Sequence, residues 1–162
     1  MHKLLAIAAG LVLLAVVNLG IWQREQLLRH GEIVLLRLAP VDPRSLMQGD
    51  YMRLDFEIAG QAANFGPALK DSDGRVVVAV DRSGVAAFRR FDTGRLLEPG
   101  ERTLRYRFRN GLVNFGTNAF FFEEGQAKAF AGAAYGEFRV ARNGDMILTG
   151  LRDDRLRRLG AD

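Results

Sequence analysis

The sequence predicts an α+β protein, in which a single N-terminal transmembrane helix precedes a mostly antiparallel β domain with one or two short helices. Two observations predict this class. Residues 4–22 form an uncharged apolar run, and short segments of alternating polar and apolar residues follow it, separated by Gly, Pro and Asn turns. The length of 162 residues allows one ordinary domain plus such an appendage. Because the chain has no Cys, a disulfide scaffold and thiol chemistry are excluded.

The apolar run from Leu4 to Trp22 is predicted to be a retained membrane anchor. As a helix, at about 1.5 Å per residue, it approaches the ~30 Å thickness of the bilayer hydrocarbon core, and Asn18 is its one strongly polar residue. A core helix of a soluble domain would carry a polar stripe, and a cleaved signal peptide would end in small residues rather than in Trp22 and its bulky neighbours. Residues 1–22 are therefore expected to be an uncleaved signal-anchor.

The side of the membrane on which the body lies is predicted from the position of the anchor rather than from charge. Lys3 on one side of the run is balanced by Arg24 and Arg29 on the other. A hydrophobic segment this close to the N-terminus acts as an uncleaved signal, and long domains that follow translocate largely regardless of charge. We therefore expect the body outside the cytoplasm, joined to the anchor by a short stalk over residues 23–31.

Residues 32–154 are predicted to form the β-rich extracytoplasmic domain. Its clearest strand signal is the alternation over residues 51–58, which places Leu54 and Phe56 among the side chains of the buried face and Tyr51 on the other face. Tight turns, such as the Asn-Gly pair near the end of the chain, separate the strand signals. The expected strands are residues 32–38, 51–58, 75–80, 85–91, 101–109, 112–115, 119–122, 135–141 and 146–151.

Three segments of the body lack the strand pattern. Residues 59–73 contain several Gly and a Pro, which predicts a loop with one helical turn. Residues 123–134 are Ala-rich with acidic residues at their start, which predicts a helix. Residues 155–162 mix both signs of charge and are expected to be a fraying tail.

The polar face of the strand predicted over residues 101–109 is cationic. Arg105, Arg107 and Arg109 alternate there with apolar residues, and they form a possible basic contact face for anionic lipid headgroups or an acidic membrane partner. The alternative is a solvated face paired to Asp55 and Glu57. Nucleic acid is not expected as a partner, because the strand has no interleaved exposed aromatic residues and the domain is placed outside the cytoplasm.

The sequence shows no recognisable catalytic constellation. The Gly49–Asp50 pair before an alternating strand resembles the box of membrane-anchored signal peptidases, but Val41 occupies the position of their nucleophilic Ser. Residues 92–94 resemble the aspartic protease triplet without its second copy, and residues 71–74 lack the later ligands of a calcium loop. The sequence therefore indicates no catalytic residue, metal ion or cofactor.

The stretch from Gly49 to Phe56 (GDYMRLDF) resembles the signature that names the GDYXXLXY family. Gly49, Asp50, Tyr51 and Leu54 match the signature, whereas Phe56 stands where the signature has Tyr. Because Phe56 has no hydroxyl, the last position cannot be a required proton donor. Further similar stretches are residues 115–118, 121–125, 135–140 and 150–152.

The resemblance implies a bacterial inner-membrane protein with one N-terminal span and a periplasmic β-rich domain. Its function is uncharacterised, and it is often encoded beside a multi-pass membrane protein. The family brings no catalytic residues, so the motif positions are carried over as a structural or interaction element. Since Leu54 falls on the predicted apolar face and Tyr51 on the other, Tyr51 is the better candidate for a contact.

The predicted function is that of a membrane-anchored extracytoplasmic domain that binds or regulates a multi-pass membrane partner beside the lipid bilayer. The alternative is a hydrolase, or a binder of a small ligand or glycan, with an unrecognised site around Asp50 and Tyr51. An enzyme should have a concave pocket with convergent ionisable groups beside Gly49 and Asp50, whereas an adaptor should have an exposed flat patch there.

Overall fold

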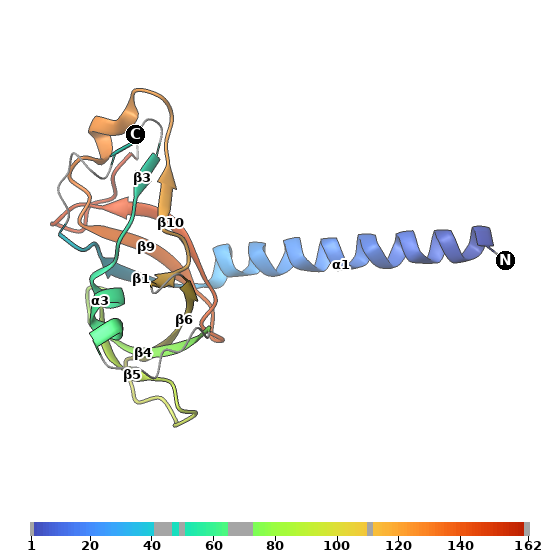
Figure 1. Ribbon diagram of the computed structural model, residues 1–162, viewed down its shortest axis with the longest axis horizontal. Helices are drawn as coiled ribbons and strands as arrows, with labels where there is room; N and C mark the ends of the chain where they lie inside the picture. Colours follow the sequence, from blue (N-terminus) through green and yellow to red (C-terminus); the bar gives the residue numbers. More distant parts are fainter. Residues whose placement is uncertain (1, 41–46, 49–50, 65–72, 110–111, 161–162) are drawn as a thin grey trace.

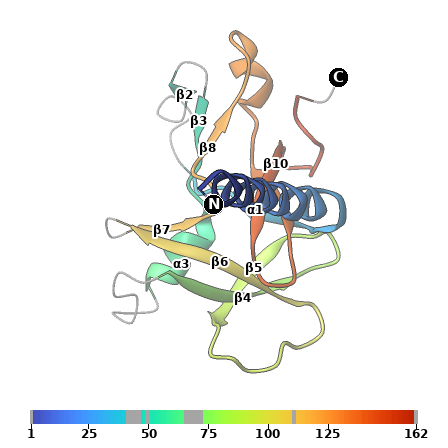
Figure 2. The ribbon, with the colours of Figure 1, turned by 90° about the vertical axis from the view of Figure 1, so that its right-hand side faces the viewer.

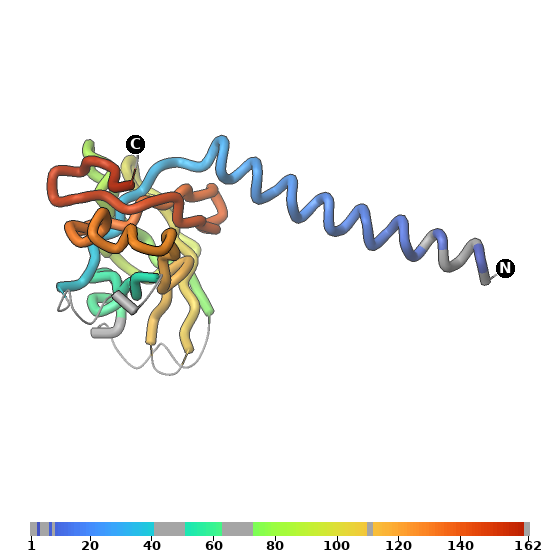
Figure 3. Tube along the Cα trace, turned by 90° about the horizontal axis from the view of Figure 1, so that it is seen from above, coloured from blue at the N-terminus to red at the C-terminus, as the bar shows by residue number. Residues whose placement is uncertain are grey.

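The computed structural model describes residues 2–40, 47–48, 51–64, 73–109 and 112–160. Its N-terminal helix, α1 (His2–His30), is continuous and projects away from the β domain (Figure 1, Figure 3). Within the part of the chain that the structure describes, Ala9–His30 is the one stretch long and apolar enough to cross a membrane. The predicted anchor and the stalk after it are thus a single helix.

The β domain is built from antiparallel sheets, which confirms the predicted β-rich α+β class. The strands are β1 (Glu32–Arg37), β2 (Met47–Gln48), β3 (Tyr51–Arg53), β4 (Gly74–Val80), β5 (Ala86–Phe91), β6 (Glu101–Arg109), β7 (Leu112–Phe115), β8 (Ala119–Phe121), β9 (Tyr135–Val140) and β10 (Met146–Arg152). They form sheets of order β1-β9-β10, β2-β3-β8 and β5-β4-β6-β7. The hairpins predicted around residues 81–84 and 142–145 are confirmed.

Two backbone contacts join two of these sheets around one core. The Leu35 N–H donates to the Gly84 carbonyl (2.8 Å), and the Arg105 N–H donates to the Gly144 carbonyl (2.9 Å). In Figure 1 these strands curve around a space that the core side chains fill, and the helix α3 (Glu57–Asn64) packs on β7, β5 and β1. The largest fully buried side chains include Phe115, Phe138, Leu35, Leu36, Met52, Leu54, Leu104 and Leu151.

The segment predicted as one strand over residues 51–58 contains a strand, an extended connection and the start of a helix. β3 ends at Arg53 and α3 runs over Glu57–Asn64, so the predicted strand is too long. The helical turn expected within residues 59–73 is part of α3, which begins earlier and is longer than one turn, and residues 65–72 of the predicted loop lie outside the described residues. The helix forms because Ile58 and Ala62, four residues apart, share one face and are both buried against the core.

The side-chain alternation predicted for this segment is confirmed even where β3 has ended. The connection stays extended because the Leu54 N–H donates to the Asn118 carbonyl (2.8 Å) and the Asp55 carbonyl accepts from the Ala39 N–H (2.7 Å). In an extended chain alternate side chains share a face. Leu54 and Phe56 therefore both point into the core, with exposed fractions of 1% and 5%.

The helix predicted over residues 123–134 is reduced to a short 3-10 helix, η1 (Gln126–Phe130). Gly125 has a φ of 85°, so an α-helix cannot run through it from the acidic residues before it. At the other end the Phe130 ring is buried, with its centroid 5.0 Å from that of Phe120. Aromatic packing rather than helix propensity sets the shape of this segment.

The C-terminal tail folds back on the sheet, so the expectation that residues 155–162 fray is wrong as far as the structure describes them. The Leu159 N–H donates to the Leu151 carbonyl (2.9 Å). The Asp153 carboxylate accepts a hydrogen bond from the Arg157 N–H (2.8 Å). This carboxylate closes a tight turn that returns the chain to the end of β10.

The helix α1 enters the β domain without a flexible linker. Gly31, between α1 and β1, is buried; its N–H donates to the Leu27 carbonyl (2.8 Å), and its carbonyl accepts from the Arg139 guanidinium (2.9 Å). A Cβ on Gly31 would lie 3.0 Å from the Arg139 Cβ and closer still to the Leu27 carbonyl oxygen. Next to it, Glu32 pairs with Arg102 through two hydrogen bonds, of which Nη2–Oε1 measures 2.8 Å. The sheet therefore holds the end of α1.

The substitution Gly31→Ala is expected to lower the free energy of unfolding by about 2 kcal/mol, because Leu27 and Arg139 must move to admit a methyl group. The control is Gly60→Ala in α3, where a Cβ meets nothing within 4 Å; it should stabilise by about 0.5–1 kcal/mol. Near-UV circular dichroism of the full-length protein in detergent measures both melting temperatures. An unchanged melting temperature for Gly31→Ala would contradict the close packing of this junction.

Candidate functional site

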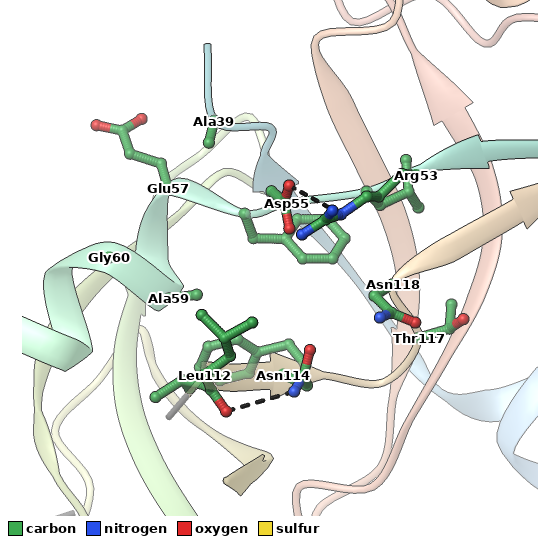
Figure 4. Close-up of a pocket in the computed structure, with 14 residues that line it drawn as sticks. Ala39, Arg53, Asp55, Glu57, Ala59, Gly60, Leu112, Asn114, Thr117 and Asn118 are labelled. Carbon is green, nitrogen blue, oxygen red and sulfur yellow. Dashed lines mark hydrogen bonds and ion pairs between the residues drawn. The ribbon is translucent and has the colours of Figure 1, made fainter. Parts of the chain in front are cut away.

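A pocket of about 480 Å³ lies between the connection after β3, α3 and β7 (Figure 4). Its floor consists of side chains that also belong to the hydrophobic core, namely Leu54, Phe56, Val113 and Phe115. Its rim is polar and comes from both sides of the pocket, with Arg53 and Asp55 on one side and Asn114 and Asn118 on the other, while the Glu57 side chain points away from the pocket. A small concave site with an apolar floor and a few polar groups has the features of a binding pocket.

Part of the motif segment, residues 49–56, lines the pocket, namely residues 53–56. Of the predicted motif positions, Gly49 and Asp50 lie outside the described residues, so the contrast expected there between pocket and flat patch stays a prediction. Tyr51 lies in β3 and is half-buried, with its ring centroid 5.7 Å from that of Phe121 on the neighbouring β8. Tyr51 therefore lies beside β8, whereas residues 53–56 of the motif segment line the pocket.

The apolar motif positions hold the segment against the core. The Phe56 ring packs edge-on against the Phe138 ring, with centroids 5.4 Å apart. A Cβ on Gly136 would lie 2.9 Å from the Phe56 ring, so this glycine makes room for the aromatic side chain. Leu54 and Phe56 thus have packing roles, and the two residues of the segment that stand on the pocket rim are Arg53 and Asp55.

The charged side chains on the rim are paired with nearby residues. The Arg53 Nε lies 3.4 Å from the Asp55 carboxylate, and the Arg37 Nε lies 3.9 Å from the Glu57 carboxylate. The alternative that Asp55 and Glu57 pair with the cationic face of β6 is therefore wrong, because Asp55 pairs with Arg53 and Glu57 pairs with Arg37. Since all four side chains are substantially exposed, these pairs add little stability.

The predicted basic face lies on β6, where Arg105, Arg107 and Arg109 are all exposed. The Arg105 guanidinium is 3.1 Å from the Asp145 carboxylate, and that of Arg109 is 2.6 Å from the Asp73 carboxylate. The hydrogen bond from Arg109 holds the pKa of Asp73 below its ordinary value. Among the described residues Arg107 has no ion-pair partner. Contact of this face with lipid or a protein stays a prediction.

Three carboxylates are buried in the part of the chain that the structure describes, and arginines neutralise each of them. They are Glu101, Glu137 and Asp153. Glu137 accepts hydrogen bonds from the Arg152 Nε (2.6 Å) and the Thr149 hydroxyl (3.0 Å), and Arg158 lies 3.9 Å away. Burial alone would raise the pKa of Glu137, but these hydrogen bonds and the two arginine charges outweigh burial and hold it below its ordinary value.

The Glu137 network is not predicted from the sequence. The available signal was a carboxylate inside the apolar strand YGEFRV, but its partners Arg152 and Arg158 come from β10 and the tail, and spacing alone does not bring them together. An ionised, fully paired carboxylate accepts hydrogen bonds and has no proton to donate, so we assign Glu137 a structural role. In the described ranges, no group of three or more His, Asp or Glu side chains could hold a metal ion.

These features define a class of protein with one membrane-length helix joined directly to an antiparallel β domain, and a pocket beside the motif segment. The family model described as GDYXXLXY protein matches residues 13–151, and the chain therefore belongs to the GDYXXLXY family. The match takes in the second half of α1, the motif segment and nearly all of the β domain, and it confirms the resemblance found in the sequence. Comparison with curated proteins and with solved structures gave no match.

The substitution Glu137→Gln is expected to lower the free energy of unfolding near neutral pH by about 2 kcal/mol, because Arg152 and Arg158 lose a buried counter-charge. Folding lowers the pKa of Glu137, so its contribution is present above the ordinary value of 4.5 and is lost as pH falls through the folded-state pKa. Denaturant unfolding at a series of pH values should therefore show the variant and wild type converging in acid.

The control for this experiment is Glu124→Gln, which removes an exposed carboxylate that has no ion-pair partner among the described residues. Its unfolding free energy should follow that of the wild type at every pH. A Glu137→Gln deficit that stayed constant down to the acid limit would show that packing, and not charge pairing, is what the substitution disturbs.

Proposed function

We propose that this protein is a membrane-anchored domain on the outer side of the bacterial inner membrane that binds or regulates an integral membrane partner. The direct join between α1 and the sheet carries the proposal. From Trp22, whose side chain suits a membrane interface, α1 continues to His30 over about 12 Å of helix. Gly31 is then fixed by Arg139. A span that ends near Trp22 would hold the domain close to the bilayer in one orientation.

A fixed orientation favours a partner that lies in the same membrane. A domain that captures soluble molecules gains nothing from a rigid join to its membrane helix. Two proteins confined to one bilayer, in contrast, meet at high effective concentration and need only a small interface. The described domain also carries exposed apolar side chains, among them Leu112 and Phe121 on the short strands β7 and β8. Such side chains suit contacts with another protein or with the membrane surface.

Membership of the GDYXXLXY family supports the same proposal. The resemblance implies one N-terminal span, a periplasmic β-rich domain and a gene that often stands beside that of a multi-pass membrane protein. That neighbouring membrane protein is the partner we propose. The arginines of β6 offer a second, weaker contact with anionic lipid headgroups, because Arg107 is exposed and forms no ion pair with another described residue.

Single-cysteine labelling tests the proposed topology, and the Cys-free chain gives no background. The Ala87→Cys variant places a thiol at an exposed position of β5, and Lys3→Cys places one before the apolar run. A membrane-impermeant maleimide added to intact spheroplasts should label the first variant at once and the second only after permeabilisation. The reverse pattern would place the β domain in the cytoplasm and refute the proposal.

A linker insertion tests whether the partner depends on the rigid join. About ten Gly and Ser residues inserted between His30 and Gly31 would free the domain from α1 without removing the anchor. Purified in mild detergent, the full-length wild type should co-elute with an integral membrane protein at a fixed ratio, and the insertion variant should retain much less of it. A wild type that elutes alone as a monodisperse species would contradict partner binding.

A further inference from the structure

One wall of the pocket is the open edge of a sheet. β7 is the last strand of the order β5-β4-β6-β7. On the side away from β6, its alternate N–H and C=O groups therefore face no other strand of the described ranges. In the view along α1, β7 lies between β6 and the strands β3 and β8 (Figure 2). Exposed sheet edges are the places where an additional strand can pair with a domain.

The opposite wall is also an extended chain with unpaired backbone groups. The Asp55 carbonyl accepts from the Ala39 N–H, so the N–H and C=O groups of Leu54 and the N–H of Phe56 point to the other side of the connection. The Phe56 carbonyl accepts from the Ala59 N–H at the start of α3. The Leu54 N–H donates to the Asn118 carbonyl, three residues beyond β7, and closes one end of the pocket. Among the described residues nothing pairs with the Phe56 N–H or the Leu54 carbonyl.

The side chains around the pocket favour an uncharged occupant. Arg53 is paired with Asp55 and Glu57 with Arg37, so the rim offers no unpaired charge to a ligand. The apolar floor accepts an aliphatic side chain, and Leu112 stands 57% exposed at the mouth. The rim amides can donate to and accept from a peptide backbone.

We propose that the pocket receives an extended, uncharged peptide segment from a non-membrane loop of the integral membrane partner, and that this segment pairs with the open edge of β7 and places one aliphatic side chain on the Leu54–Phe56 floor. The proposal rests on the proposed function and names the part of the partner that is bound.

Photo-cross-linking in the native membrane tests this proposal. Benzoylphenylalanine replacing Leu112 stands at the mouth of the pocket, and the same residue replacing Leu96, 93% exposed on the β5–β6 loop, is the matched control. Irradiation should give a discrete adduct from position 112 and none from position 96. Mass spectrometry of that adduct should identify a loop segment of an integral membrane protein.

A substitution that fills the pocket provides a second test of the proposal. Gly60 lines the pocket, and a Cβ there meets nothing within 4 Å, so Gly60→Trp should fold and cover the pocket, whereas Gly60→Ala leaves it open. The adduct from position 112 should fall about tenfold with Gly60→Trp and stay within about twofold with Gly60→Ala, which corresponds to a loss of about 1.4 kcal/mol in the first case.

The outcomes separate the two proposals. If an integral membrane protein co-elutes with the full-length chain but position 112 gives no adduct, or if Gly60→Trp leaves the adduct unchanged, the pocket is not the docking site and the proposed function stands. An adduct to a transmembrane helix, to a soluble protein or to a second copy of this chain also overturns the strand-pairing proposal. If no integral membrane protein co-elutes, the proposed function itself fails.

Discussion

The packing of Gly31 between the last turn of α1 and Arg139 is the constraint on which the arrangement of the molecule depends. Since even a Cβ there would force Leu27 and Arg139 to move, α1 passes into β1 through a closely packed glycine. β1 then pairs with β9 over Glu32–Arg37 and lies beside Val85, so one strand connects the helix to both sheets that enclose the core.

The sequence predicts which side chains are buried better than it predicts where strands end. Alternation correctly places Leu54 and Phe56 in the core, because an extended backbone has a period of two whatever lies beside it. The end of β3 depends instead on Asn118 and Ala39, which take over the backbone pairing and are distant in sequence. In the same way, the left-handed Gly125 restricts a helix that composition alone predicts.

In the candidate site, too, the faces of the side chains are predictable and their tertiary neighbours are not. Leu54 and Tyr51 fall on opposite faces as predicted, yet the pocket itself could not be predicted, because its second wall is β7 and nothing in the motif segment indicates which strand will face it. The Glu137 network could not be predicted either. Arg152 and Arg158 are brought to Glu137 by the β9–β10 turn and by the reversal of the tail, and the mixed charges of the tail predicted fraying rather than pairing.

Recognition through the backbone would account for the composition of the motif segment. The named positions Leu54 and Phe56 hold the chain extended against Phe138, whereas Arg53 and Asp55, which the family signature leaves unspecified, stand on the rim. Binding through the N–H and C=O groups of the connection would tolerate changes at those rim positions, because the backbone edge is the same for every side chain. It would also explain how Phe can replace Tyr at position 56, since a buried ring without a hydroxyl presents the same edge.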